Sequence, residues 1–106
     1  MKIIILTRDI KDGEKLRNSL RIFDSAFENL CCFTKKEVLN KTTDLSDCEY
    51  IFSTWYMPNF TEEEIHVLFP SLKCVFYAAG TVKYFAEPLL RSGIRVFSAP
   101  FQLVSF

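Results

Sequence analysis

The feature that most constrains the fold of this chain is a series of short apolar segments in which polar residues do not alternate. The first of them, "KIIIL" at 2–6, is a run of β-branched residues. A strand of this kind has both faces covered, as in a parallel sheet between two layers of helices. Similar runs follow at 30–33, 50–54, 72–79 and 94–99. The sequence therefore predicts five buried strands.

The segment after the first strand has the spacing of an amphipathic helix. Its apolar residues recur at steps of three and four, which places them on one face of a helix. They are Leu16, Leu20, Phe23, Phe27 and Leu30. The polar segment 34–47 has room for one short helical turn.

Two further helices are expected in the second half of the chain. Thr61 and Glu64 have the spacing of a capping box, and Pro70 marks the end of the helix that they begin. In the segment 81–93, Pro88 either divides the helix into two short turns or begins a second helix. Gly93 is suited to the C-cap of this segment.

Strands that alternate with helices predict an α/β fold with helices on both faces of a parallel sheet. Five strands in 106 residues indicate one flavodoxin-like domain. We expect this domain to span 1–99, followed by an atypical apolar tail at 100–106. In such sheets, ligands bind beyond the carboxyl ends of the strands, where the strand order reverses.

Composition excludes several classes of function. Thirteen basic and thirteen acidic residues balance, and no basic run is interleaved with aromatic residues, so neither a nucleic-acid nor a membrane partner is expected. No apolar run has the length of a signal peptide or a membrane span, which favours a cytoplasmic location. The cysteines form no CxxC pair and only one histidine accompanies them, so we expect reduced thiols and no metal site. The four are Cys31, Cys32, Cys48 and Cys74.

Two loops are candidates for a binding site. Ala79, Gly80, Thr81 and Val82 join the fourth strand to a helix, where backbone N–H groups bind carboxylate or phosphate. Gly80 could equally supply only the tight turn. The other loop, Trp55, Tyr56 and Met57, follows the third strand and either walls a pocket or covers the end of the sheet as core.

Two polar residues, Lys83 and His66, are further candidates for this binding site. Lys83 follows the glycine by one helical turn and either attracts an anion or is a solvated helix residue. His66 is expected on the surface of its helix, away from the strand ends. The glycines at 13, 80 and 93 are too widely spaced for a dinucleotide or phosphate-binding glycine motif.

Several segments together resemble the N-terminal part of the D-isomer-specific 2-hydroxyacid dehydrogenases. They are "YIFSTWYMP", "FTEEEI", "FPSLKCVFYAAGTVKYF" and "SGIRVFSA", between Tyr50 and Ala99. The resemblance implies a flavodoxin-like substrate domain into which an NAD- or NADP-binding domain is inserted. It also implies that the loop Ala79, Gly80, Thr81 and Val82 binds the carboxylate of a 2-hydroxy or 2-oxo acid. The loop from Trp55 to Met57 would line the same cleft.

The chain departs from this family in two respects. Lys83 stands where the family often has Asn or Asp, and "PFQLVSF" is unlike the helix that leads to the cofactor domain. The cofactor domain and the catalytic Arg, acidic residue and His are supplied by later segments of the family. We therefore expect a substrate-domain fragment that is inactive alone, binds no cofactor itself and lacks catalytic residues.

Two other functions remain open. One is a non-catalytic regulatory module that forms a homodimer or pairs with a related chain, with the tail residues Phe101, Leu103, Val104 and Phe106 covering one sheet face. The other is a receiver domain of the same fold, which needs an acidic residue at the end of the third strand. Thr54 and Trp55 occupy that place, so the pattern does not favour a receiver.

Overall fold

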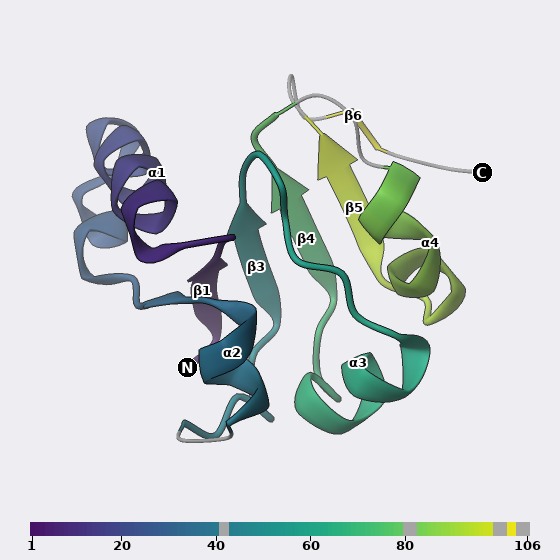
Figure 1. Cartoon of the computed structure of the whole chain (residues 1–106). Helices are drawn as coiled ribbons and strands as arrows, with labels where there is room; N and C mark the ends of the chain where they lie inside the picture. Colours follow the sequence, from purple (N-terminus) through teal and green to yellow (C-terminus); the bar gives the residue numbers. More distant parts are fainter. Residues whose placement is uncertain (41–42, 80–82, 99–101, 104–106) are drawn as a thin grey trace.

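The strands form one sheet in the order β2-β1-β3-β4-β5-β6. A computed structural model describes residues 1–40, 43–79, 83–98 and 102–103. The first five strands are parallel, which confirms the flavodoxin-like sheet (Figure 1). Their bounds are β1 (Ile3–Leu6), β2 (Cys32–Phe33), β3 (Tyr50–Ser53), β4 (Cys74–Tyr77) and β5 (Arg95–Ser98).

The sequence pattern did not predict the sixth strand. β6 (Gln102–Leu103) pairs antiparallel with β5, with Phe97 opposite Leu103 and Ser98 opposite Gln102. The tail therefore extends the sheet at its β5 edge. Its expected role in covering a sheet face concerns side chains that lie outside the described part of the chain.

The helices of the first half differ from the expected pattern at two places. The first is Phe23, which was expected on the apolar stripe but is 85% exposed. The second is a break: α1 (Ile10–Phe23) ends before the apolar stripe does, and the stripe continues in a 3-10 helix, η1 (Ser25–Asn29). Asp24 lies at the break, where its carboxylate accepts a hydrogen bond of 2.9 Å from the Ala26 N–H. Aspartate side chains compete with helical hydrogen bonds in this way. α2 (Lys35–Leu39) is the short turn expected in the polar connection.

The later helices match the predicted signals more closely. α3 (Glu62–Leu68) begins with the capping box of Thr61 and Glu64, whose two hydrogen bonds measure 2.9 and 3.1 Å. α4 (Lys83–Arg91) is one helix with Pro88 inside it, so neither expected division occurs. Pro88 is the sixth of the nine residues of α4, where its missing N–H removes one intrahelical hydrogen bond without ending the helix.

Gly93 ends α4 as predicted, with φ of +80°. Its N–H donates to Leu90 and the Ile94 N–H donates to Leu89, at 3.1 and 3.0 Å. These two bonds form a Schellman motif.

The two faces of the sheet carry different helices. One face packs on α2, α3 and α4, and includes Ile4, Ile51 and Val75 in the larger core cluster. The opposite face carries α1 and η1, with Ile5 packed against Leu16 and Leu20. On that opposite face, Phe rings stack across β3, β4 and β5, with centroids 4.9 and 5.4 Å apart. The helices therefore lie in two layers, as the sequence pattern predicts.

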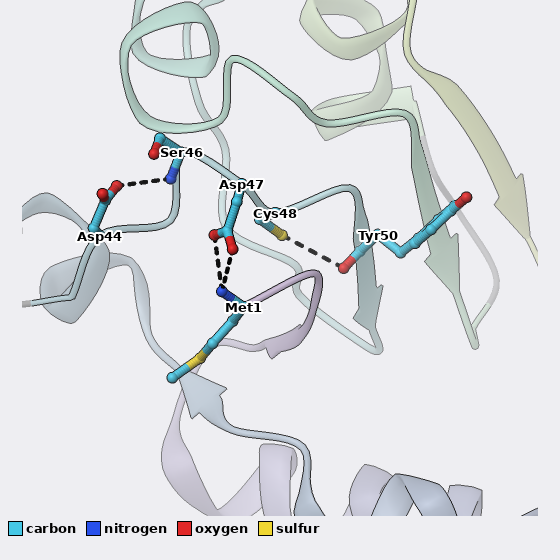
Figure 2. Close-up of polar contacts among 6 residues, drawn as sticks. All are labelled: Met1, Asp44, Ser46, Asp47, Cys48 and Tyr50. Atoms are coloured by element: carbon cyan, nitrogen blue, oxygen red, sulfur yellow. Dashed lines mark hydrogen bonds and ion pairs between the residues drawn. The ribbon is translucent and has the colours of Figure 1, made fainter.

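Polar contacts fix the amino ends of the strands (Figure 2). The Met1 ammonium group contacts both carboxylate oxygens of Asp47, at 2.8 and 2.7 Å. Asp44 accepts a hydrogen bond of 2.9 Å from the Ser46 N–H. These contacts order the loop that enters β3. None of the helices in the described ranges has the length and apolar character needed to cross a membrane.

Candidate functional site

A cavity of about 730 Å³ opens at the carboxyl ends of β1, β3 and β4. The chain order of the strands reverses here, because β1 lies between β2 and β3. This is the position at which doubly wound sheets bind ligands. The cavity is lined by Arg8, Asp12, Lys15, Leu16, Ser19, Thr54, Trp55, Tyr56 and Ala78.

Two buried hydroxyl groups hold the strand ends that directly precede the cavity residues Arg8 and Thr54. Ser53 Oγ donates a hydrogen bond to the Leu6 carbonyl, which links the end of β3 to the end of β1. Thr7 Oγ1 donates to the Asp9 carbonyl at 2.7 Å. Both side chains have no solvent exposure. The loop that carries Arg8 is therefore fixed relative to β3.

Arg8 is held on two sides at the cavity rim. Its Nε and Nη2 lie 3.1 and 3.0 Å from Asp12 Oδ2, and its Nε lies 3.6 Å from Asp9. Its guanidinium carbon Cζ lies 4.7 Å from the centre of the Tyr56 ring. Ion pairs at such exposure stabilise a fold little, but together with a cation–π contact they restrict the side chain.

Tyr56 adopts a backbone conformation that is unusual for a residue with a side chain. Its φ is +61°, and the left-handed region costs roughly 1–2 kcal/mol outside glycine. Backbone strain of this kind gathers at functional sites. In this backbone conformation, the Tyr56 ring lies over the guanidinium group of Arg8.

Tyr77 supports this loop from the core. Burial raises the pKa of its hydroxyl group, and hydrogen bonding with Tyr84 adds to the rise, while the backbone of Tyr56 opposes it. The neutral hydroxyl is therefore the stable form near the loop after β3.

The predicted site residues divide among three environments. Trp55 and Tyr56 line the cavity, with 56% and 64% of their surface exposed. Met57 is buried in the larger core cluster, so it does not reach the cavity. Ala79 is also buried in that cluster, directly after the cavity residue Ala78. Gly80, Thr81 and Val82 lie outside the described residues, as does the side chain of Lys83.

Sequence reasoning missed the contribution of α1 and of the loop before it. Arg8, Asp12, Lys15 and Ser19 line the cavity, although "RDIKDG" reads only as a turn. Two signals were available. Charged residues follow the first strand directly, and Asp12, Lys15 and Ser19 have the spacing of one helix side.

The remaining reactive groups lie away from the cavity. His66 is exposed on α3, as expected. All four cysteines are free. Burial raises the pKa of Cys48 to about 11, and burial also raises the pKa of Cys32, so neither thiol is activated. Across the described ranges, no group of His, Cys, Asp and Glu could hold a metal ion.

Comparison with known proteins identifies the fold. No family model matches the chain, and no curated protein matches its sequence. Among solved structures, it is similar to an NAD-dependent formate dehydrogenase from Staphylococcus aureus in complex with NAD, with a TM-score of 0.59 and 21% identity. The match covers 92% of this chain and 31% of that protein.

At this identity the likeness concerns the fold, and it agrees with the fold that the sequence resemblance implied. The chain spans about a third of the dehydrogenase. The described residues therefore have the α/β fold of one segment of an NAD-dependent dehydrogenase.

Proposed function

We propose that this chain is a substrate-domain segment like that of the D-isomer-specific 2-hydroxyacid dehydrogenases, and that it binds the carboxylate of a 2-hydroxy or 2-oxo acid. The observation that carries the proposal is the cavity at the carboxyl ends of β1, β3 and β4. It extends to Ala78, which with Ala79 directly precedes the loop 80–82.

The chemistry of the two loops supports carboxylate binding. Small residues at 78–80 allow an acid to approach the backbone, and the N–H groups that follow are donors of the kind that carboxylates accept. Trp55 and Tyr56 line the cavity and exclude water from part of a bound acid. In this proposal Gly80, Thr81 and Val82 bind the carboxylate, Trp55 and Tyr56 flank it, and Ala79 and Met57 support the loops from the core.

Hydride transfer would require groups beyond this chain. Oxidation of a 2-hydroxy acid needs a hydride acceptor and a base. We propose that NAD or NADP binds to a separate domain, because no dinucleotide glycine motif occurs in the sequence. The similar solved protein is NAD-dependent and about three times as long as the matched segment. The chain alone is then a binding module without catalytic residues.

A ligand-detected NMR titration with pyruvate, D-lactate and NADH tests the proposal. Pyruvate or lactate should bind, Gly80→Val should weaken that binding by about tenfold or more, and NADH should not bind. Trp55→Ala should also weaken acid binding. Val67→Ala is the matched control, because Val67 is similarly exposed but lies on α3, away from the cavity. Absence of acid binding, or binding of NADH, would contradict the proposal.

A dimerising or regulatory module is the second candidate. Ile22 and Phe23 at the end of α1 have exposed fractions of 82% and 85%, which favours a contact surface. We expect a homodimer by light scattering after size exclusion, and Ile22→Ser with Phe23→Ser should shift it toward monomer. A monomeric mass for the unmodified chain at high concentration would exclude self-association.

A further inference from the structure

We propose that Arg8, assisted by Lys15, binds a second anionic group of the ligand, so that the preferred acid carries two acidic groups. This inference rests on the proposed function, since the first carboxylate is assigned to the loop 80–82. It adds a selectivity site on the loop after β1, across the cavity from Ala78.

The contacts of Arg8 with described residues orient its guanidinium group but do not use all of its hydrogen-bond donors. A guanidinium group has five N–H donors in a fixed plane. Among the described residues, the contacts of Arg8 with carboxylates use Nε and Nη2. Its Nη1 has no partner there. With its Cζ 4.7 Å from the centre of the Tyr56 ring, the group can still offer the Nη1 end to an incoming carboxylate.

Lys15 supplies a second positive charge beside Arg8. It lines the same cavity one helical turn beyond Asp12, and within the described ranges its ammonium group makes no ion pair. The charged lining residues are Arg8, Lys15 and Asp12, which sum to one net positive charge (two minus one). Asp9, which does not line the cavity, lies 3.6 Å from Arg8 and offsets this charge. An added anionic group would instead pair with the Nη1 end of Arg8 and with Lys15, which have no carboxylate partner among the described residues.

The dimensions of the cavity suit an acid longer than pyruvate. β1 and β4 are separated by β3 alone, so their carboxyl ends lie about 10 Å apart at the usual strand spacing. Arg8 follows β1 and Ala78 follows β4, and both line the cavity. Its volume of about 730 Å³ would hold roughly 20 water molecules at about 30 Å³ each. A diacid that extends from the loop after β4 toward Arg8 fits this span.

A matched pair of probes isolates the second charge. The acids 2-oxoglutarate and 2-oxopentanoate have the same chain length and differ in a terminal carboxylate instead of a methyl group. Calorimetric or NMR titration of the unmodified chain should give a Kd about tenfold lower for 2-oxoglutarate. Arg8→Gln should reduce the difference to about threefold or less, the part that Lys15 alone supports. Lys15→Gln should reduce the preference about threefold.

Lys11→Gln is the matched control, because Lys11 is an exposed lysine on α1 that does not line the cavity. It should keep the full preference. A purely structural role for Arg8 would weaken both acids equally, and Arg8→Lys should restore part of the preference only if charge recognition is involved. If Arg8→Gln does not fold, Lys15→Gln provides the test. A reduced preference for 2-oxoglutarate would support the second anion site, and an unchanged preference would overturn it.

The outcomes separate this inference from the proposed function. Equal binding of both acids by the unmodified chain, or an Arg8→Gln variant that keeps the full preference, would overturn the role of Arg8 and leave the proposed function intact. Binding of 2-oxoglutarate alone, lost in Arg8→Gln and unaffected by Gly80→Val, would support the role of Arg8 and contradict the assignment of the carboxylate to the loop 80–82. Binding of neither acid would overturn both.

Discussion

Tyr56 combines a backbone conformation that costs stability with an exposed side chain, as we would expect of a residue that takes part in the proposed binding. Its left-handed backbone is strained, its side chain is largely exposed, and its ring lies over Arg8. No residue type in the segment "TWYMP" at 54–58 requires a positive φ at Tyr56. The sequence could therefore predict the loop but not this conformation. Met57, next along, is buried in the core, which the residue type alone also leaves undecided.

Tyr56→Gly separates the two roles. Glycine removes the left-handed strain, while the contact with Arg8 is lost, so the two effects should offset. We expect the free energy of unfolding in urea to change by less than about 1 kcal/mol, while acid binding weakens severalfold. A large loss of stability would show that the Tyr56 ring is part of the core, contrary to its exposure.

Asp47 gives a pH-dependent prediction at the opposite end of the sheet. The hydrogen bond from the Met1 ammonium group lowers the pKa of its carboxyl group below the ordinary 3.8. A lowered folded-state pKa stabilises the fold above the unfolded-state pKa, and the contribution disappears as pH falls through the folded value.

The stability difference between the unmodified chain and Asp47→Asn should therefore be complete at neutral pH and vanish below the folded pKa. NMR titration of the Asp47 carboxyl group measures that pKa directly. A value at or above 3.8 would contradict the contact shown in Figure 2.

At the scale of elements, local sequence signals predicted where helices begin and end better than they predicted whether a helix continues without a break. The capping box of Thr61 and Glu64 begins α3, and Gly93 ends α4. The sequence did not predict the break between α1 and η1 at Asp24. The 3-10 helix η1 keeps Phe27 packed against the sheet, so the apolar spacing continues across the break. The effect of Pro88 was overestimated, since the helix tolerates a proline in its interior at the loss of one hydrogen bond.

The packing of α1 depends on the absence of a side chain at Gly13. A Cβ there would lie 3.0 Å from Cys32 Cβ and 3.1 Å from Thr7 Oγ1. Gly13→Ala should destabilise the fold by about 0.5–2 kcal/mol, because overpacking of about 1–3 kcal/mol outweighs the roughly 1 kcal/mol that alanine gains over glycine within a helix. Asn18→Ala, at an exposed position of the same helix, should change stability by less than about 0.5 kcal/mol. Equal urea midpoints for the two variants would contradict the close approach of α1 to β2.

At the scale of the whole molecule, the order of apolar runs and helical stripes was enough to predict the parallel sheet. The site was only partly predictable. The loops after β3 and β4 have distinctive residues, whereas Arg8 and Lys15 belong to an ordinary charged helix start. Their relevance follows from strand order, which places the end of β1 beside that of β3. β6 depends on a two-residue antiparallel pairing that is too short to give a periodic pattern.

The central claim is that an acid binds at the carboxyl ends of the strands. Two-dimensional ¹H–¹⁵N NMR of the labelled chain during titration with pyruvate tests it most directly. The amides of Arg8, Thr54 and Ala78 should shift with one common Kd, while those of Asp44 to Asp47 at the amino ends should not. Saturable shifts confined to other surfaces, or no shifts at any concentration, would contradict the account.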